Sequence, residues 1–155
     1  MNCRDVIRAK QKLDNLFDKV NELPNDAIEL RAHWARYLCV LVAGFLEQSL
    51  RSIYGEYATK TSAPNTASFV LRRLRGFRNA KMQAILELTA SFNSGWHNDL
   101  KIATDGELRD AVDTIVSNRH LIAHGKDVGI TFVGLKTYYE RAYKVVESID
   151  EQCNR

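Results

Sequence analysis

The chain has 155 residues, of which 45% are hydrophobic and 26% are charged, a balance that excludes a wholly disordered protein. Two prolines and eight glycines are fewer than the many tight turns of a β-sandwich require, so a turn-rich all-β fold is disfavoured. The net charge of +3 is only mildly basic and is far from that of a histone-like tail.

The first third of the chain has the apolar spacing of two helices. Residues 6–20 place apolar side chains at helical intervals, and the Leu-Pro-Asn-Asp sequence at 23–26 ends this helix and offers a cap to the next. The second helix is expected over residues 26–57, and at ~1.5 Å per residue it would exceed about 40 Å. Its middle part is apolar nearly all round, so we expect it to be the central helix.

The middle of the chain predicts a loop and two shorter helices. Residues 59–66 are rich in turn-forming types and predict the loop. Helical patterns follow at 67–74 and at 79–92. The Asn-Ser-Gly-Trp-His-Asn run at 93–98 is expected to break the second of these helices.

Two more helices are predicted in the last third. The first covers residues 107–123, and Gly125 stands where a C-terminal cap belongs, because glycine accepts a left-handed backbone. Residues 128–133 are ambiguous and compatible with an extended segment, and 135–152 form the closing helix. No repeat or linker divides the sequence. We therefore predict one all-α domain over residues 1–155, an up-and-down bundle of five or six helices.

The cysteines and the apolar runs bear on location and cofactors. Cys3, Cys39 and Cys153 form no C-x-x-C pair and have no histidine at metal-ligand spacing, so neither a disulfide framework nor a zinc site is expected. No cofactor-binding motif is present, and no cofactor is expected. The longest apolar run, 37–46, is half of the ~20 residues that cross a bilayer, and no signal-peptide pattern opens the chain. We expect a cytoplasmic protein with no membrane partner.

Five basic side chains gather between residues 69 and 84, where the sequence contains no acid. Such a group can bind phosphate, and contact with nucleic acid is one interpretation of it. A solvated helix face followed by a loop is the alternative, and the more common one for a group of this size. This basic cluster consists of Arg72, Arg73, Arg75, Arg78 and Lys81.

The segment 117–125, Ser-Asn-Arg-His-Leu-Ile-Ala-His-Gly, carries the side chains best suited to chemistry. Arg119 lies one turn after Ile115 on the apolar stripe, so its guanidinium faces the interior or an interface and requires a partner there. His120 and His124 are four residues apart and share one helix face. Metal-independent phosphodiester cleavage uses such groups, with imidazole moving protons and guanidinium holding the phosphate oxygens.

A single regular helix does not unite the arginine with the second histidine. Five steps of about 100° leave Arg119 and His124 about 140° apart. The two groups meet only if the helix ends early or if a second copy of the chain completes the site across a two-fold axis. The alternative without catalysis is an arginine satisfied in the core and a histidine that caps the helix.

Glu47 is the carboxylate most suited to support this segment. Helical spacing places it on the inward side of the central helix, so we expect it to be partly buried beside a cation. Either it orients Arg119 or a histidine, or it forms a structural ion pair with Arg36, Arg51 or Arg119. Asn118 similarly either binds substrate or bonds to the backbone of its own helix.

The Arg-His-Leu-Ile-Ala-His-Gly string at 119–125 resembles the signature of the HEPN superfamily of nucleotide-binding domains. That signature is an arginine, often followed by a polar residue, with a histidine four to six residues further on. Arg119, His120 and His124 match its three positions.

Two upstream stretches further resemble the subgroup called RiboL-PSP-HEPN. They are His-Trp-Ala-Arg-Tyr at 33–37 and Gly-Phe-Leu-Glu-Gln-Ser-Leu at 44–50. The resemblance covers most of the chain, from about residue 30 to residue 149.

The resemblance implies a metal-independent endoribonuclease that acts as a homodimer, with two copies of the motif lining one cleft and cleavage leaving a cyclic phosphate. On this hypothesis Arg119 holds the scissile phosphate, His124 is the general acid or base, and His120 assists it. Glu47 supports these groups from behind, while the basic cluster and Asn118 contact RNA.

The resemblance also implies a toxin–antitoxin or antiviral defence setting, with a cognate antitoxin or a neighbouring defence protein as a partner. Two alternatives remain open. One is a catalytically inactive module of the same fold that binds nucleotides or partner proteins. The other is an activity that adds a nucleotidyl group to a tyrosine of a partner.

Overall fold

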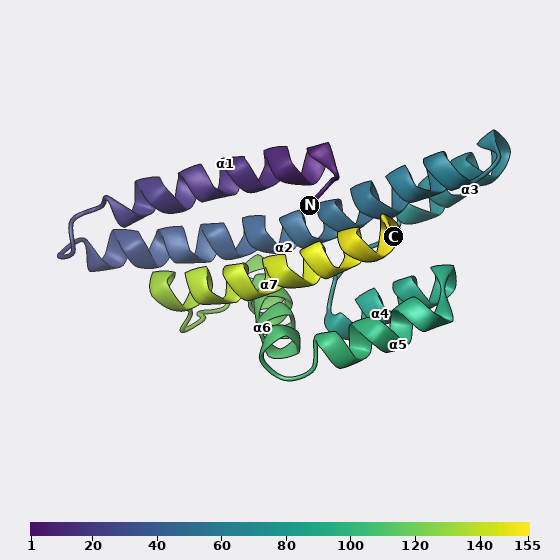
Figure 1. Cartoon of the computed structure of the whole chain (residues 1–155). Helices are drawn as coiled ribbons and strands as arrows, with labels where there is room; N and C mark the ends of the chain where they lie inside the picture. The colour runs from purple at the N-terminus through teal and green to yellow at the C-terminus, as the bar shows by residue number, and fades with distance from the viewer.

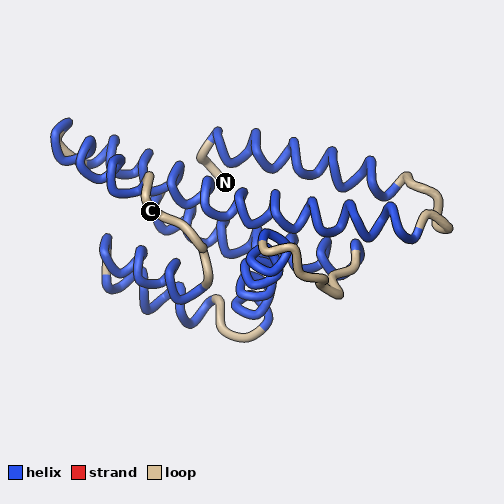
Figure 2. Tube along the Cα trace, turned by 180° about the vertical axis from the view of Figure 1, so that it is seen from behind, coloured by secondary structure: helices blue, strands red, loops and turns tan.

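The computed structural model describes residues 1–155 and consists of helices joined by short loops, without a strand (Figures 1 and 2). The all-α prediction is therefore confirmed. There are seven helices rather than five or six. They are α1 (Arg4–Asn21), α2 (Ile28–Thr61), α3 (Pro64–Leu74), α4 (Met82–Phe92), α5 (Ser94–Ala103), α6 (Glu107–Ala123) and α7 (Phe132–Cys153).

Helix α2 is the axis of the fold, as its apolar middle predicted. Its 34 residues run the length of the molecule, and α1 and α7 lie alongside it (Figure 1). Helix α3 turns back along the C-terminal part of α2, α4 and α5 pack as a pair, and α6 crosses beneath α2 and α7. None of the helices combines the length and the apolar character needed to cross a membrane.

The core surrounds the middle of α2. Leu38, Leu46 and Leu50 are fully buried there, among apolar side chains of α1, α4, α6 and α7. One buried polar pair in this core links two helices, since polar groups removed from water are stable there when they are hydrogen-bonded. Tyr54 on α2 shares a hydrogen bond of 2.7 Å with Thr89 on α4, and so ties the α4–α5 pair to the axis.

The predicted loop at 59–66 is wrong. Helix α2 continues to Thr61 and α3 begins at Pro64, so only two residues lie between them. The threonine hydroxyls at 59 and 61 each donate to the backbone carbonyl four residues earlier at 2.8 Å, which fits them to a helix. Proline suits the first turn of α3, where its missing N–H would have had no intrahelical partner.

Residues 93–98 do more than break a helix. The side-chain oxygen of Asn93 accepts hydrogen bonds from the backbone N–H groups of Gly95 at 2.8 Å and Trp96 at 3.1 Å. This N-cap starts α5, the helix absent from the prediction. Two starting residues also differ from the prediction, because α4 begins at Met82 rather than at residue 79 and α7 begins at Phe132 rather than at residue 135. The segment 128–133, which the sequence left ambiguous, is therefore irregular up to residue 131 and helical after it.

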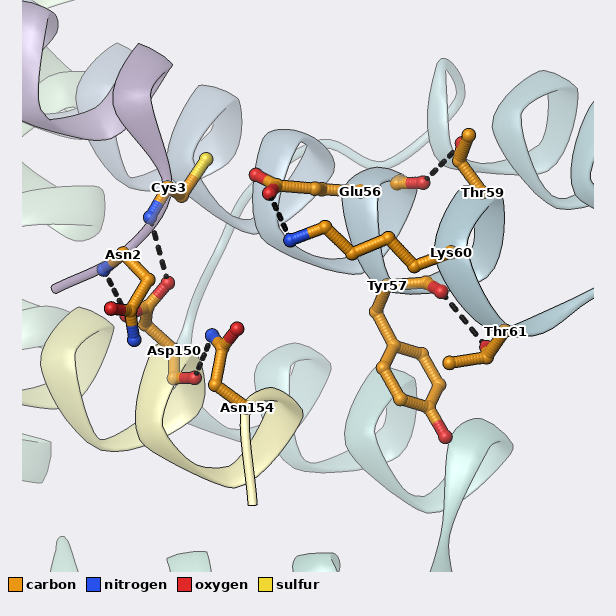
Figure 3. A network of polar contacts seen from close by, with 10 residues as sticks. Asn2, Cys3, Glu56, Tyr57, Thr59, Lys60, Thr61, Asp150 and Asn154 are labelled. Atoms are coloured by element: carbon orange, nitrogen blue, oxygen red, sulfur yellow. Dashed lines mark hydrogen bonds and ion pairs between the residues drawn. The ribbon is translucent and has the colours of Figure 1, made fainter.

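The start of α1 is fixed by α7. The carboxylate of Asp150, which is 1% exposed, accepts hydrogen bonds from the backbone N–H groups of Asn2 at 2.6 Å and Cys3 at 3.2 Å. Figure 3 shows these bonds beside the ion pair between Glu56 and Lys60 on α2. The buried carboxylate thus binds the backbone N–H groups of the two residues that precede α1, and so holds the start of this helix against α7.

Candidate active site at the end of α6

Helix α6 ends where the sequence predicted. Gly125 has a φ of +69°, and the backbone N–H groups of Gly125 and Lys126 donate to the carbonyls of Ile122 and Leu121, both at 3.0 Å. This pair of bonds is the Schellman arrangement that closes a helix. The helix therefore stops immediately before His124, which occupies the C-cap position with a φ of −93°.

The two motif histidines form an exposed pair. Their ring centroids are 4.5 Å apart with the rings edge to face, and both residues are exposed. The backbone N–H of His124 still donates to the carbonyl of His120 at 3.2 Å, which preserves the helical spacing of the side chains. Solvent or a bound molecule can therefore reach both imidazoles.

Arg119 contacts the α3–α4 loop (residues 75–81) rather than the histidines. Its side chain is half-buried, and Nη1 donates to the side-chain Oδ1 of Asn79 at 3.2 Å. No hydrogen bond joins Arg119 to His120 or His124 within the chain. This separation agrees with the angle that the helical geometry predicted.

Glu47 reaches Arg119 only through Asn79. Its Oε1 accepts a hydrogen bond from the backbone N–H of Asn79 at 2.9 Å, and its Oε2 lies 3.5 Å from Nη2 of Arg51. The direct ion pair with Arg119 is not formed, and Arg51 is the cation that compensates Glu47. Arg51 also donates to the carbonyl of Phe77, so α2 holds the loop at two points.

Two residues that the sequence reasoning missed complete this arrangement. Asn79 stands between Glu47 and Arg119 with a φ of +52°, and the carboxylate of Asp113 on α6 accepts from the backbone N–H of Met82 at 2.8 Å. An asparagine shortly after Gly76 indicates a turn, because asparagine tolerates the left-handed backbone. The pattern around Asp113, on a predicted helix, carried no such signal.

The basic cluster is exposed and has no acidic partner. None of its five side chains takes part in an ion pair, although the guanidinium of Arg73 lies over the ring of Phe69 at 5.5 Å. Arg78 immediately precedes Asn79, and Lys81 follows it by two residues. Because Asn79 contacts Arg119, the structure brings the end of the basic cluster beside the arginine of the motif.

Asn118 bonds to its own helix. Its Nδ2 donates to the backbone carbonyl of Thr114 at 2.9 Å, which is the local bond considered as the alternative to substrate contact. The side-chain oxygen of Asn118 has no partner in the chain and can still accept a hydrogen bond.

A groove of about 650 Å³ runs beside this region, between α2, α3 and the start of α1. Arg51 and Arg75 both line it, so it connects the pair formed by Glu47 and Arg51 to the basic cluster. A second groove, of about 600 Å³ between α1 and α7, contains no residue of the motif or of the basic cluster. No group of three or more histidine, cysteine or acidic side chains is placed to hold a metal ion.

The fold and the site together define a class of small all-α domain with an arginine and two histidines at the end of a late helix. The sequence model of the RiboL-PSP-HEPN family matches residues 4–155, which is essentially the whole chain. The chain belongs to this family, and the resemblance found in the sequence is confirmed. Membership supports a nuclease-like or RNA-related role. The comparisons with curated proteins and with solved structures gave no match.

Proposed function

We propose that this protein is a metal-independent endoribonuclease whose active site is formed by two copies of the motif at the end of α6. The observation that carries the proposal is that exposed His120 and His124 lie at the same end of α6 as Arg119. The side chain of Arg119 is hydrogen-bonded to the α3–α4 loop, which also carries Arg78 and Lys81. Acid–base groups and a phosphate-binding surface thus share one region of the molecule.

The chemistry follows from the side chains. One imidazole removes the proton of a ribose 2′-hydroxyl, whose oxygen attacks the adjacent phosphorus, and a second imidazole protonates the departing 5′-oxygen. The guanidinium of Arg119 stabilises the charge that grows on the non-bridging oxygens. The product is a 2′,3′-cyclic phosphate. We assign the main acid–base role to His124, with His120 assisting it.

A homodimer supplies the geometry that one chain lacks. Arg119 turns towards Asn79, whereas His124 is at the C-cap with its ring against His120. A two-fold axis near the end of α6 would set the guanidinium of one copy opposite the imidazoles of the other. Both histidines are exposed, as such a shared cleft requires.

Cleavage of labelled RNA in the presence of EDTA tests the proposal. Cleavage is expected to survive chelation and to fall by at least about 100-fold in both Arg119→Ala and His124→Ala. Arg109→Ala on the same helix and His97→Ala on α5 are matched controls that should cleave normally. Undiminished cleavage by either motif variant refutes the assigned roles, and binding without cleavage by the unaltered protein supports an inactive binding module.

Mixing the two inactive variants tests whether the site is shared. In a mixed dimer of Arg119→Ala and His124→Ala, one composite site keeps its arginine from one copy and its histidine from the other. After subunit exchange, recovery of about one quarter of the normal activity is expected. If each chain forms its own site, the mixture stays inactive.

The biological setting belongs to the same proposal. We place the enzyme in a toxin–antitoxin or antiviral defence system, with an antitoxin or a neighbouring defence protein as its partner. Induced expression should then arrest growth, and Arg119→Ala should relieve the arrest. Normal growth at matched expression of the active protein counts against a toxin role.

A further inference from the structure

Asn79, in the α3–α4 loop, has a left-handed backbone conformation. It is the one residue other than glycine with a positive φ, at +52°. The left-handed conformation is unfavourable for an L-residue, and it persists where surrounding contacts hold it. The contacts at Asn79 identify what holds it.

Asn79 is bonded through both its backbone and its side chain. Its N–H donates to Oε1 of Glu47 at 2.9 Å, and its side-chain Oδ1 accepts from Arg119 at 3.2 Å. Its carbonyl accepts from the N–H of Lys81 at 2.7 Å, which closes the turn. The left-handed backbone therefore lets one residue face α2 with its amide and α6 with its side chain.

We propose that Asn79 is a positioning residue that orients the guanidinium of Arg119 towards the phosphate, an inference that rests on the proposed ribonuclease function. A free arginine side chain samples many rotamers, and fixing it in one of them costs conformational entropy. The bond to Asn79 uses Nη1 and leaves Nη2 and Nε free to bind two phosphate oxygens.

The neutral side chain of Asn79 matters for the charge of the site. The negative charge of Glu47 is compensated by Arg51. Glu47 forms no ion pair with Arg119 and is linked to it only through Asn79, whose backbone N–H donates to the Glu47 carboxylate. A direct carboxylate partner would orient Arg119 but would also offset the positive charge that attracts phosphate. The relay Glu47–Asn79–Arg119 thus positions the guanidinium and leaves its charge available to RNA.

Two variants separate these effects, and both tolerate the left-handed backbone. Asn79→Gly removes the acceptor and is expected to lower kcat/KM about 10-fold, mainly through kcat, because Arg119 is no longer fixed. Asn79→Asp keeps the acceptor but adds a negative charge, and is expected to raise KM with a smaller effect on kcat. Asn25→Gly, in the exposed turn between α1 and α2, is the matched control and should cleave normally.

If Asn79→Gly cleaves RNA at the wild-type rate in the same assay in which Arg119→Ala is inactive, the positioning role is refuted and the ribonuclease function still stands. An equal loss of kcat in Asn79→Asp and Asn79→Gly contradicts the charge argument. Unfolding temperatures within a few degrees of the unaltered protein separate these losses from a change in folding.

A readout without RNA keeps the inference independent of activity. The order parameter of the Arg119 Nε–Hε group, measured by NMR relaxation, is expected to fall in Asn79→Gly and to be retained in Asn79→Asp and Asn25→Gly. An unchanged order parameter in Asn79→Gly refutes the inference even if the protein cleaves no RNA.

Discussion

The carboxylate of Asp113 on α6 accepts a hydrogen bond from the backbone N–H of Met82, the first residue of α4, at 2.8 Å. Residues 31 positions apart thereby join the motif helix to the helix that follows the α3–α4 loop. The loop is fixed at this end by Asp113 and earlier by Glu47 and Arg51. Its placement beside Arg119 therefore depends on helices α2 and α6 together.

Replacement of Asp113 by alanine should destabilise the protein by about 1–2 kcal/mol, because α4 loses the acceptor and the negative charge at its N-terminus. Lys81, at the N-cap of α4, makes no side-chain capping bond that could compensate. Urea denaturation at neutral pH measures the change. The exposed Asp99→Ala on α5 is the control, expected within about 0.5 kcal/mol of the unaltered protein. Equal stabilities of the two variants would contradict the capping role.

Glu47→Ala should cost more than Glu47→Gln. Alanine leaves both the N–H of Asn79 and the half-buried guanidinium of Arg51 without this partner, at about 2–4 kcal/mol. Glutamine keeps an oxygen for the N–H of Asn79 and loses only the ion pair, at about 1 kcal/mol. Chemical denaturation gives both values, with the exposed Glu87→Ala on α4 as the control. A variant Glu47→Ala as stable as Glu47→Gln shows that the bond to Asn79 contributes nothing.

Local chemistry explains which parts of the fold could be predicted. The sequence predicted that Gly125 ends α6, because glycine, which has no Cβ, adopts the left-handed backbone conformation that closes a helix. At Asn93 the sequence predicted only the end of a helix, because asparagine is equally common in turns and as an N-cap. The side chain of Asn93 in fact caps a new helix, α5, by accepting from the N–H groups of Gly95 and Trp96. The predicted loop at 59–66 failed because the threonine hydroxyls bond back within the helix.

The sequence identified the residues of the candidate site but not the contacts between them. The motif spacing identified Arg119, His120 and His124, and helical spacing indicated a partly buried Glu47. The contact between Arg119 and Asn79 joins residues 40 positions apart, and it depends on how α2 and α6 place the loop between them. Such a tertiary contact leaves no periodic signal in the sequence.

The basic cluster should contribute to RNA affinity through counterion release. In an inactive His124→Ala background, the double variant Arg78→Gln and Lys81→Gln should reduce the slope of log Kd against log salt by about 1–1.5 for a single-stranded RNA. The control is Lys136→Gln with Lys144→Gln on α7, which changes the net charge equally away from the motif. Fluorescence anisotropy at several salt concentrations measures both slopes. Equal slopes for the two double variants would show that the basic cluster does not contact phosphate.

Alkaline pH should weaken the fold through the buried thiol of Cys39. Burial raises the pKa of Cys39 from 9.0 to about 11, and its side chain lies in the core against the carbonyl of Ile115. The folded protein therefore keeps this proton where the unfolded chain releases it. The stabilisation is complete below pH 9 and is lost as the pH rises from 9 towards 11, by about 2 kcal/mol.

Substitution isolates this contribution from the other groups that titrate in the same range. Cys39→Ala should lower the free energy of unfolding at neutral pH, because it removes a buried side chain, but it should flatten its decline between pH 9 and 11. Val42→Ala, one turn further along α2 and also fully buried, is the control. It should lower the free energy of unfolding by the same amount at every pH, because valine carries no proton to lose. Parallel declines in all three proteins, measured by denaturation at each pH, would place the alkaline sensitivity elsewhere than at Cys39.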